Sequence, residues 1–242
     1  MKMLLMTLAA SMAACAGCSH AAVTPRSAAA GSPAAAAVTL AAPSGAGELK
    51  TEEVLKRMEE AGKSLVTLQA DFRQERTYAL FGEKRVSSGT IRYKKPGMML
   101  WEYREPDRTA IYLKGGKALM YVPDIKQAQK ISLARDRKTE SLLIGFGNTA
   151  EEITRNFTVR ASAGPDGCPV LDLTPKSPEL AAHFQKLRLV IDPKRWVPVR
   201  SERFEQGGDT TVFTFSNVRT DAALEDEVFD FAIPAGVEVV EY

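Results

Sequence analysis

The chain has 242 residues, enough for one large domain or two small ones, and hydrophobic residues make up 45% of it, so a substantial core can form. Its 32 Lys and Arg against 30 Asp and Glu give a net charge of only +2 at pH 7. Such a balanced charge lacks the basic footprint of a nucleic-acid-binding protein, and we expect no nucleic acid among its partners.

The N-terminus predicts an export signal. Lys2 precedes the apolar stretch Met3–Ala14, which has the length of a signal peptide and is too short to span a bilayer. Cys15 and Cys18 follow it, and small residues before a cysteine resemble a bacterial lipobox, in which the cysteine is acylated and becomes the mature N-terminus. We interpret residues 1–18 as a signal peptide with a lipobox and favour Cys15 as the acylated residue. Ordinary cleavage at a small-x-small site is the alternative.

A linker and a helix come next. Residues 19–47 are dominated by Ala, Ser, Pro and Gly without a periodic apolar pattern, which is typical of a flexible linker. Glu48–Gly62 then has apolar residues at helical spacing, and the acidic pair Glu52 and Glu53 suits the first turn of a helix. The apolar stripe of this amphipathic helix consists of Val54, Leu55, Met58 and Ala61.

The next part of the chain alternates between apolar and polar residues, the pattern of strands with one buried face. Leu65–Leu80 predicts a long strand, followed by a hairpin turn at Phe81-Gly82-Glu83. Ser88–Pro123 predicts four short antiparallel strands. The turns between these four strands are Pro96-Gly97, Pro106-Asp107 and Gly115-Gly116.

The remainder predicts further strands and short helices. Lys126–Leu133 is expected to be a strand, Thr139–Phe146 a short apolar helix, and Glu151–Thr154 a helix or turn. The later strands are expected at Phe157–Ala161, Val170–Thr174, Phe184–Ile191, Val197–Glu205, Thr210–Phe215 and Val228–Ile233. Roughly eleven strands with two or three short helices predict a mainly β fold, a single sheet with helices on one face.

The sequence offers no constellation for catalysis. The two histidines, His20 and His183, cannot form a histidine-based metal cluster or a Ser-His-Asp triad. Gly115-Gly116 and Gly207-Gly208 lie between strands and fit hairpin turns better than a phosphate-binding loop. Cys168 is the one cysteine of the expected folded part, so no internal disulfide is available there. We expect no enzymatic activity, no metal and no cofactor.

The apolar residues form a stronger pattern. A sheet of this many strands can curl far enough to enclose space, and methionine is an adaptable lining residue, although an ordinary packed core would give a similar pattern. The short helix Ser141–Phe146 could cover the opening as a removable lid through Leu142, Leu143 and Phe146. The candidates for one concave face are Phe72, Ile91, Tyr93, Met99, Trp101, Tyr112, Leu119, Tyr121, Leu187, Leu189, Phe213 and Phe215.

An ordered set of short motifs resembles the periplasmic outer-membrane lipoprotein carrier (LolA-like) family. The motifs are Lys94-Lys95-Pro96, Trp101, Pro106-Asp107, Gly115-Gly116-Lys117 and Tyr121-Val122-Pro123, with Gln127 or Gln129 soon after. The resemblance covers most of the chain beyond about Glu48, so we expect a single LolA-like lipid-binding domain at 48–242.

This resemblance implies both a fold and a function. The fold is a strongly curved, unclosed antiparallel half-barrel, with helices as a lid over a hydrophobic cavity. The function is non-enzymatic: a periplasmic monomer takes lipoprotein acyl chains from an inner-membrane lipoprotein-release complex and passes them to an outer-membrane acceptor. Because this chain could itself be lipidated, a lipid-anchored acceptor or a carrier of other lipids on the same fold is an alternative. A protein-binding sensor domain is a further one.

The resemblance also marks Lys95 as the switch residue. The family typically has Arg before this proline, and Lys keeps the charge but loses the planar donor fork. Strand alternation directs Lys94 and Lys95 to opposite faces, with Lys95 on the side of Ile91 and Tyr93. We therefore expect Lys95 to donate hydrogen bonds to carbonyl groups of the lid or to lie at the mouth of the cavity.

Overall fold

The computed structural model describes residues 50–132 and 148–241, which lie in one compact unit, Ala46–Tyr242. Cys15 and Cys18 lie outside the described residues, as does the expected helix Thr139–Phe146 with Leu142, Leu143 and Phe146.

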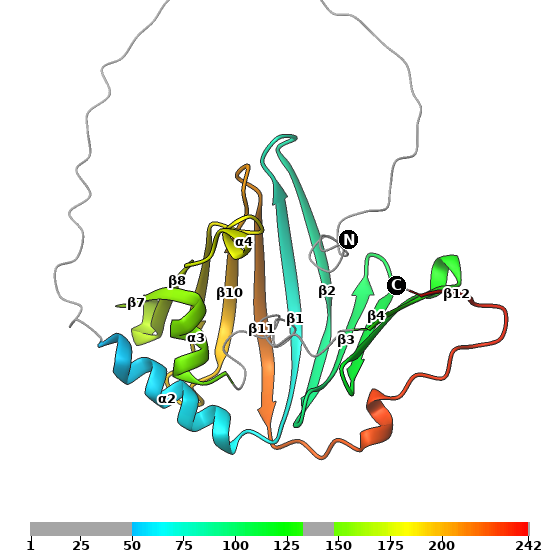
Figure 1. Ribbon diagram of the computed structural model, residues 1–242, viewed down its shortest axis with the longest axis horizontal. Helices are drawn as coiled ribbons and strands as arrows, with labels where there is room; N and C mark the ends of the chain where they lie inside the picture. Colours follow the sequence, from blue (N-terminus) through cyan, green and yellow to red (C-terminus); the bar gives the residue numbers. More distant parts are fainter. Residues whose placement is uncertain (1–49, 133–147, 242) are drawn as a thin grey trace, which may run out of the picture. The chain divides into compact units, whose positions relative to one another are not determined.

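The unit is built on one sheet of twelve strands, in the order β12-β6-β5-β4-β3-β2-β1-β11-β10-β9-β8-β7 (Figure 1). The edge strands β7 and β12 do not pair with each other, so the sheet is open, and the predicted mainly β fold with a single unclosed sheet is confirmed. The strands are β1 Thr67–Tyr78, β2 Glu83–Lys94, β3 Met98–Glu105, β4 Thr109–Lys114, β5 Lys117–Val122, β6 Gln127–Ser132, β7 Phe157–Ala163, β8 Pro169–Pro175, β9 Lys186–Ile191, β10 Pro198–Phe204, β11 Thr210–Thr220 and β12 Glu238–Glu241.

The helices are short apart from the first. They are α2 Thr51–Ser64, α3 Ala150–Asn156 and α4 Pro178–Ala181, with the 3₁₀ turns η1 Pro123–Ile125, η3 Pro165–Gly167 and η4 Asp226–Phe229. α2 confirms the predicted amphipathic helix, since Val54, Leu55 and Met58 are buried, but it extends past Gly62 to Ser64. A capping box at Thr149 begins α3.

Strand alternation gives the sheet two different faces. We call the side that carries Phe72, Ile91, Met99, Trp101 and Phe215 the inner face. The opposite side, the outer face, carries Met98, Leu100 and Tyr112.

The helices α2 and α3 lie over one part of the inner face. The register continues this face through Leu189 of β9 and Leu171 of β8, and both leucines are fully buried. α2 packs against α3 and β7, and Figure 1 shows both helices across the half of the sheet that contains β7–β10. The ion pair between Asp172 and Arg188 lies on the outer face of the same strands.

The C-terminal segment departs from the prediction. Val228–Ile233 does not form a strand: η4 and irregular chain replace it, because Phe229 is buried against Met98 and Leu100 on the outer face and not in a ladder. The last strand is instead β12, and it pairs in parallel with β6. Among the described strands this is the one parallel pair, in a sheet that was expected to be fully antiparallel.

The first hairpin is longer than expected. β1 ends at Tyr78 and β2 begins at Glu83, so the turn consists of residues 79–82, and β2 extends well before the predicted start at Ser88. Gly82 has φ +64°, a left-handed conformation that glycine adopts without strain.

Candidate functional site

An aromatic cluster occupies the centre of the inner face. The ring of Phe72, from β1, lies 5.2 Å from Trp101, 5.0 Å from Tyr103 and 5.9 Å from Phe213, measured between centroids. Trp101 and Phe213 are a further 5.2 Å pair with an edge-to-face geometry. Such tilted aromatic pairs add to the stabilisation that comes from burial alone. The cluster joins three strands, β1, β3 and β11.

Gly89 makes the cluster possible. It lies in β2 between its partners Phe72 on β1 and Tyr103 on β3. A Cβ atom at this position would lie 1.8 Å from the carbonyl oxygen of Glu102 and 2.9 Å from the Phe72 ring. Since no side chain stands here, the rings of the two neighbouring strands approach each other across β2.

Most of the predicted site residues share this face. Seven of them belong to one apolar cluster: Phe72, Ile91, Tyr93, Met99, Trp101, Phe213 and Phe215. Leu187 and Leu189 lie on the same face further along, since Leu189 pairs with Ser201 and Ser201 with Phe213. For these nine residues the expected common face is confirmed; acyl-chain binding there stays a prediction.

Tyr112, Leu119 and Tyr121 do not lie on the inner face, so the prediction of one shared face is wrong for them. Tyr112 pairs with Leu100 and with Leu119, which places these residues on the outer face. Phe231 packs against them there, with its ring 5.0 Å from Tyr112 and 4.8 Å from Tyr121. The sheet carries apolar residues on both faces at this end, so aromatic character alone does not identify the inner one.

The sequence reasoning missed inner-face residues on β3 and β4. These are Tyr103, Ile111 and Leu113, which pack in the same cluster as Trp101. The register of the β3–β4 hairpin could have identified Ile111. Trp101 and Ile111 are equally distant from Pro106 along the chain and pair with each other. Counting outward from the turn would have selected Ile111 in place of Tyr112.

Three buried polar atoms of the inner face have no hydrogen-bond partner within the described part of the chain. They are Trp101 Nε1, Gln74 Oε1 and Arg76 Nε. The guanidinium of Arg76 also lies 3.6 Å from Glu205 and 4.0 Å from Asp209, so its charge is compensated. A polar group without a partner loses its hydration and gains nothing in return, so this packing carries a cost.

Burial also acts on the tyrosine of the cluster. Removal of the Tyr103 side chain from water raises its pKa well above the usual range, because the phenolate would be poorly solvated there. Tyr103 therefore stays a neutral phenol, and the aromatic cluster carries no charge.

Lys95 contacts carbonyl groups of α2, while the expected lid helix Ser141–Phe146 lies outside the described residues, so the role of Lys95 as a switch stays a prediction. Its Nζ donates to the backbone carbonyl of Gly62 and lies 3.4 Å from that of Lys63, both in the last turn of α2. A cation at this end is favoured by the unpaired carbonyls and the helix dipole. Lys94 points to the opposite face, where its Nζ donates to the Leu224 carbonyl at 2.6 Å and to Asp226 at 2.6 Å.

Within the described residues, α2 makes few other polar contacts with the rest of the chain. Glu59 accepts from the Ala150 backbone N–H at 3.0 Å, and Thr51 Oγ1 accepts from Ala161 N–H at 3.0 Å. Arg57 lies over the ring of Trp196 at 4.9 Å. Among the described residues, the helix is held mainly by its apolar stripe and by a small number of polar and cation–π contacts.

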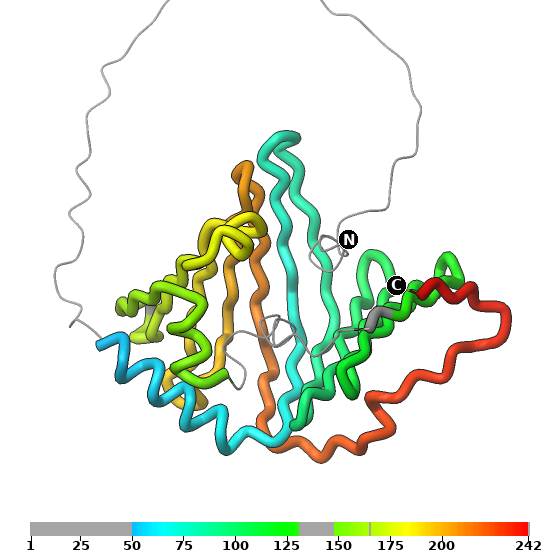
Figure 2. The backbone as a smooth tube through the Cα atoms, viewed as in Figure 1, coloured from blue at the N-terminus to red at the C-terminus, as the bar shows by residue number. Residues whose placement is uncertain are grey.

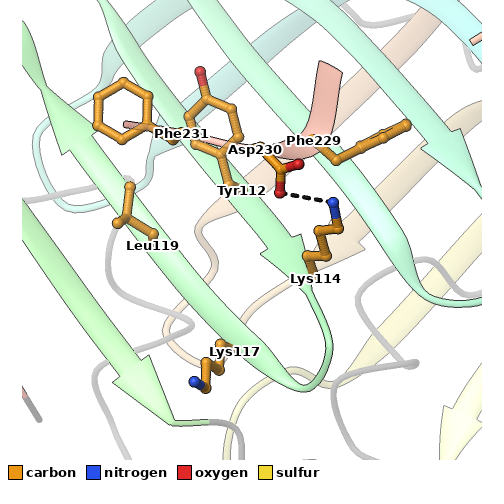
Figure 3. A pocket seen from close by; sticks show the side chains of 7 residues that line it. All are labelled: Tyr112, Lys114, Lys117, Leu119, Phe229, Asp230 and Phe231. Carbon is orange, nitrogen blue, oxygen red and sulfur yellow. Dashed lines mark hydrogen bonds and ion pairs between the residues drawn. The ribbon is translucent and has the colours of Figure 1, made fainter. Parts of the chain in front are cut away.

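A separate pocket of about 130 Å³ lies on the outer face, between β4, β5 and the C-terminal segment (Figure 3). Tyr112, Leu119, Phe229 and Phe231 supply its apolar walls. The ion pair between Lys114 and Asp230, 2.6 Å long, closes one side. This pocket is a local gap under the C-terminal segment and is not continuous with the aromatic cluster.

The described residues offer no metal-binding cluster. Within 50–132 and 148–241, no group of three or more His, Cys, Asp and Glu side chains could hold a metal ion. The same residues include no helix that is long and apolar enough to cross a membrane. Cys168 is a free, half-buried thiol.

Comparisons with known proteins agree with this architecture. Residues 63–232 match the family model described as outer membrane lipoprotein carrier protein LolA. The outer-membrane lipoprotein carrier protein of Methylococcus capsulatus is 32% identical over 72% of this chain and 81% of its own length. That of Dechloromonas aromatica is 29% identical over 74% and 83%. A solved structure, an uncharacterized conserved protein from Thermus thermophilus, has the same fold, with a TM-score of 0.51 at 12% identity, covering 79% of this chain and 98% of that one.

Proposed function

The chain belongs to the LolA family of outer membrane lipoprotein carrier proteins, and on this premise we propose that it carries lipoproteins through the periplasm towards the outer membrane. In this proposal the acyl chains of the cargo bind on the inner face of the sheet, and no covalent step is involved. The observation that supports it most directly is the aromatic and aliphatic cluster around Phe72 and Trp101, which faces the side of the sheet that α2 and α3 partly cover.

The driving force is burial of hydrocarbon. Each acyl CH₂ group moved from water to an apolar surface gains about 0.8 kcal/mol, so a few contacts along the chain suffice for binding. The side chains of the closed inner face compete with the cargo for the same surface. This competition keeps the affinity low enough for release.

The unpartnered polar atoms support a closed state that is poised to open. Trp101 Nε1 and Gln74 Oε1 are buried without a hydrogen bond to any described residue, and each such group costs about 1–3 kcal/mol. Exposure of these atoms to water or to polar groups of the cargo would recover part of that cost. The free-energy gap between closed and open states is thereby reduced, as a reversible carrier requires.

The N-terminal segment favours a second candidate, a lipid-anchored acceptor. The export signal at 1–18 and the cysteines Cys15 and Cys18 would place the protein in the periplasm, either free or tethered to a membrane. An acceptor of this kind would use the same inner face for acyl chains. The two functions differ in whether the protein moves between membranes.

The test compares two aromatic residues of adjacent strands on opposite faces. Trp101→Glu should abolish acyl-chain binding, because it places a charge in the aromatic cluster, whereas Tyr112→Glu on the outer face should retain it. Binding is measured as lipid that copurifies with the protein and is identified by mass spectrometry. Thermal unfolding midpoints establish whether each variant is folded.

Phe213→Ala serves as a milder inner-face variant if Trp101→Glu fails to fold. It removes one ring of the cluster and should reduce the bound lipid while the sheet stays intact. Equal lipid content in Phe213→Ala and wild type, with Tyr112→Glu also unchanged, would show that the inner face is a packed core and that lipid binds elsewhere or not at all.

A further inference from the structure

The tip of the β1–β2 hairpin exposes two adjacent large apolar side chains. Leu80 is 85% exposed and Phe81 is 72% exposed, more than any other large apolar residue of the described chain, of which the next is Val66 at 55%. Single exposed apolar residues are common on protein surfaces, but a Leu-Phe pair at one tip concentrates apolar area where no other part of the described chain covers it.

The hairpin projects beyond its neighbours. β3 pairs with β2 only from Ser88 onwards, so Glu83–Ser87 pairs with β1 alone. Figures 1 and 2 show the hairpin, in cyan, extending past the adjacent turns of the sheet. Within the hairpin, β1 pairs with β2 without interruption from Thr67 to Tyr78. At the turn, the Ala79 N–H donates to the Asp209 carboxylate at 2.9 Å. The tip therefore lies at the end of a regularly paired, projecting hairpin.

The shape of the tip selects the kind of partner. A stable protein interface buries about 1,200–2,000 Å² over a complementary surface, which two side chains at the end of a narrow arm cannot supply. A bilayer interface accepts a narrow convex protrusion, because lipids rearrange around it. Lys84 and Arg85 lie just after the tip, beyond Glu83, and both are exposed. Lys84 is paired with Glu75 at 2.8 Å, so Arg85 is the cation that favours an anionic lipid surface beside the apolar pair.

We propose that Leu80 and Phe81 insert into the interfacial layer of an anionic bilayer and dock the protein reversibly on a membrane. Arg85 strengthens the encounter with anionic headgroups. The tip and Lys95 lie at opposite ends of β2, so docking requires no movement of α2. The proposal goes beyond acyl-chain binding and does not depend on it, because it concerns the bilayer surface and not a cargo in the sheet.

The test places a fluorophore at the tip of the full chain. Phe81→Trp is mixed with vesicles of equimolar phosphatidylcholine and phosphatidylglycerol, with brominated or ordinary acyl chains. We expect a blue shift of the added emission and stronger quenching by the brominated lipid. Ile125→Trp, 45% exposed on η1, is the matched control and should show neither effect. An N-terminal anchor does not confuse this readout, because quenching reports the depth of the tryptophan itself.

A second pair of variants measures the contribution of the tip. The double change Leu80→Ser and Phe81→Ser should lower vesicle partitioning about tenfold, equivalent to about 1.4 kcal/mol, whereas Ile125→Ser should not. The amount of copurified lipid should be the same in the double variant and in Ile125→Ser. This result would distinguish membrane docking by the tip from acyl-chain binding on the inner face. Absence of quenching in Phe81→Trp, or equal quenching in Ile125→Trp, would overturn membrane docking; a blue shift with purified periplasmic proteins but not with vesicles would assign the tip to a protein partner instead.

Discussion

At the scale of single residues, Trp101 combines favourable packing with an unpaired donor. Its ring contacts Phe72 and Phe213, yet its Nε1 is buried without a partner in the described part of the chain. A core selected for stability alone would hold an apolar ring here, since a buried donor without an acceptor is costly. The presence of tryptophan is consistent with a surface that is covered only part of the time.

Gly89 carries the first prediction at this scale. Gly89→Ala should destabilise the fold by about 1–3 kcal/mol, because its Cβ would overlap the Glu102 carbonyl and force β2 and β3 apart. Ser87→Ala, on the same face of the same strand, is the control and should change the free energy of unfolding little. Urea unfolding measures both, and equal stabilities of Gly89→Ala and wild type would show that the sheet tolerates a wider β2–β3 spacing at this point.

At the scale of elements, Lys95 links the sheet to α2. Its Nζ donates to the Gly62 carbonyl, and hydrogen bonds of charged groups are typically worth about 1.5–3 kcal/mol. Because α2 has few other polar contacts with the described residues, loss of this one should alter how readily the helix moves off the inner face. Lys94, adjacent in the chain but directed to the outer face, provides an internal control.

We therefore predict that Lys95→Leu changes cargo release more than cargo uptake, by up to about tenfold if about 1.4 kcal/mol is lost. Lys95→Arg should be tolerated, since charge and reach are kept, and Lys94→Leu should leave release unchanged. A transfer assay between labelled donor and acceptor membranes measures the rates. Equal release rates for wild type, Lys95→Leu and Lys95→Arg would show that Lys95 is only a surface charge without a role in release.

The β8–β9 pair carries a pH prediction. Arg188 donates to both oxygens of Asp172, at 2.7 and 2.9 Å, and these hydrogen bonds hold the pKa of Asp172 below its ordinary value of 3.8. The folded carboxylate thus has the lower pKa, so its stabilising effect is complete above pH 3.8 and is lost as the pH falls through the folded pKa.

Asp172→Asn should accordingly flatten the acid limb of the stability profile below pH 3.8 and lower stability at neutral pH. Arg188→Gln should flatten it in the same way, because it removes the partner that lowers the pKa. Thermal unfolding midpoints across the acid range measure the effect. An acid limb as steep in Asp172→Asn as in wild type would assign the acid sensitivity to other carboxylates.

At the scale of the whole molecule, local patterns predicted most strands but not always the face on which a residue lies or whether an apolar run forms a strand. Alternation in β1 and β3 selected Phe72 and Trp101, because each strand has one face in the apolar cluster. It failed for Tyr112, whose face depends on the register of a hairpin. It also failed for Val228–Ile233, which packs on the outer face without a ladder, since apolar spacing does not distinguish these two forms of burial.

β12 could not be predicted from its own residues. Glu238–Glu241 has no alternating run of useful length, and its partner β6 lies more than a hundred positions earlier in the chain. The contact begins where the Glu238 N–H donates to the Lys126 carbonyl at 2.9 Å. Such long-range pairing depends on how the whole sheet brings its edge strand close to the C-terminal segment. It therefore cannot be predicted from the sequence of either strand alone.

We expect the N-terminal cysteines to decide whether the folded unit is tethered to a membrane. Residues 19–47, if they behave as the flexible coil their composition predicts, span roughly 30 Å, about the thickness of the hydrocarbon core of one bilayer. An acylated Cys15 would therefore keep the unit Ala46–Tyr242 beside the membrane that holds the anchor, which suits an acceptor better than a shuttle.

We predict that radiolabelled fatty acid enters the full-length protein and that Cys15→Ser abolishes the incorporation, because the label then has no thiol at the favoured lipobox position. Gel autoradiography of the purified protein measures it, and the intact mass gives the mature N-terminus. Incorporation that persists in Cys15→Ser but disappears in Cys18→Ser would move the acylated residue to Cys18. Absence of label in the wild type would identify a freely diffusing protein, for which transfer between separated membranes should need no contact between them.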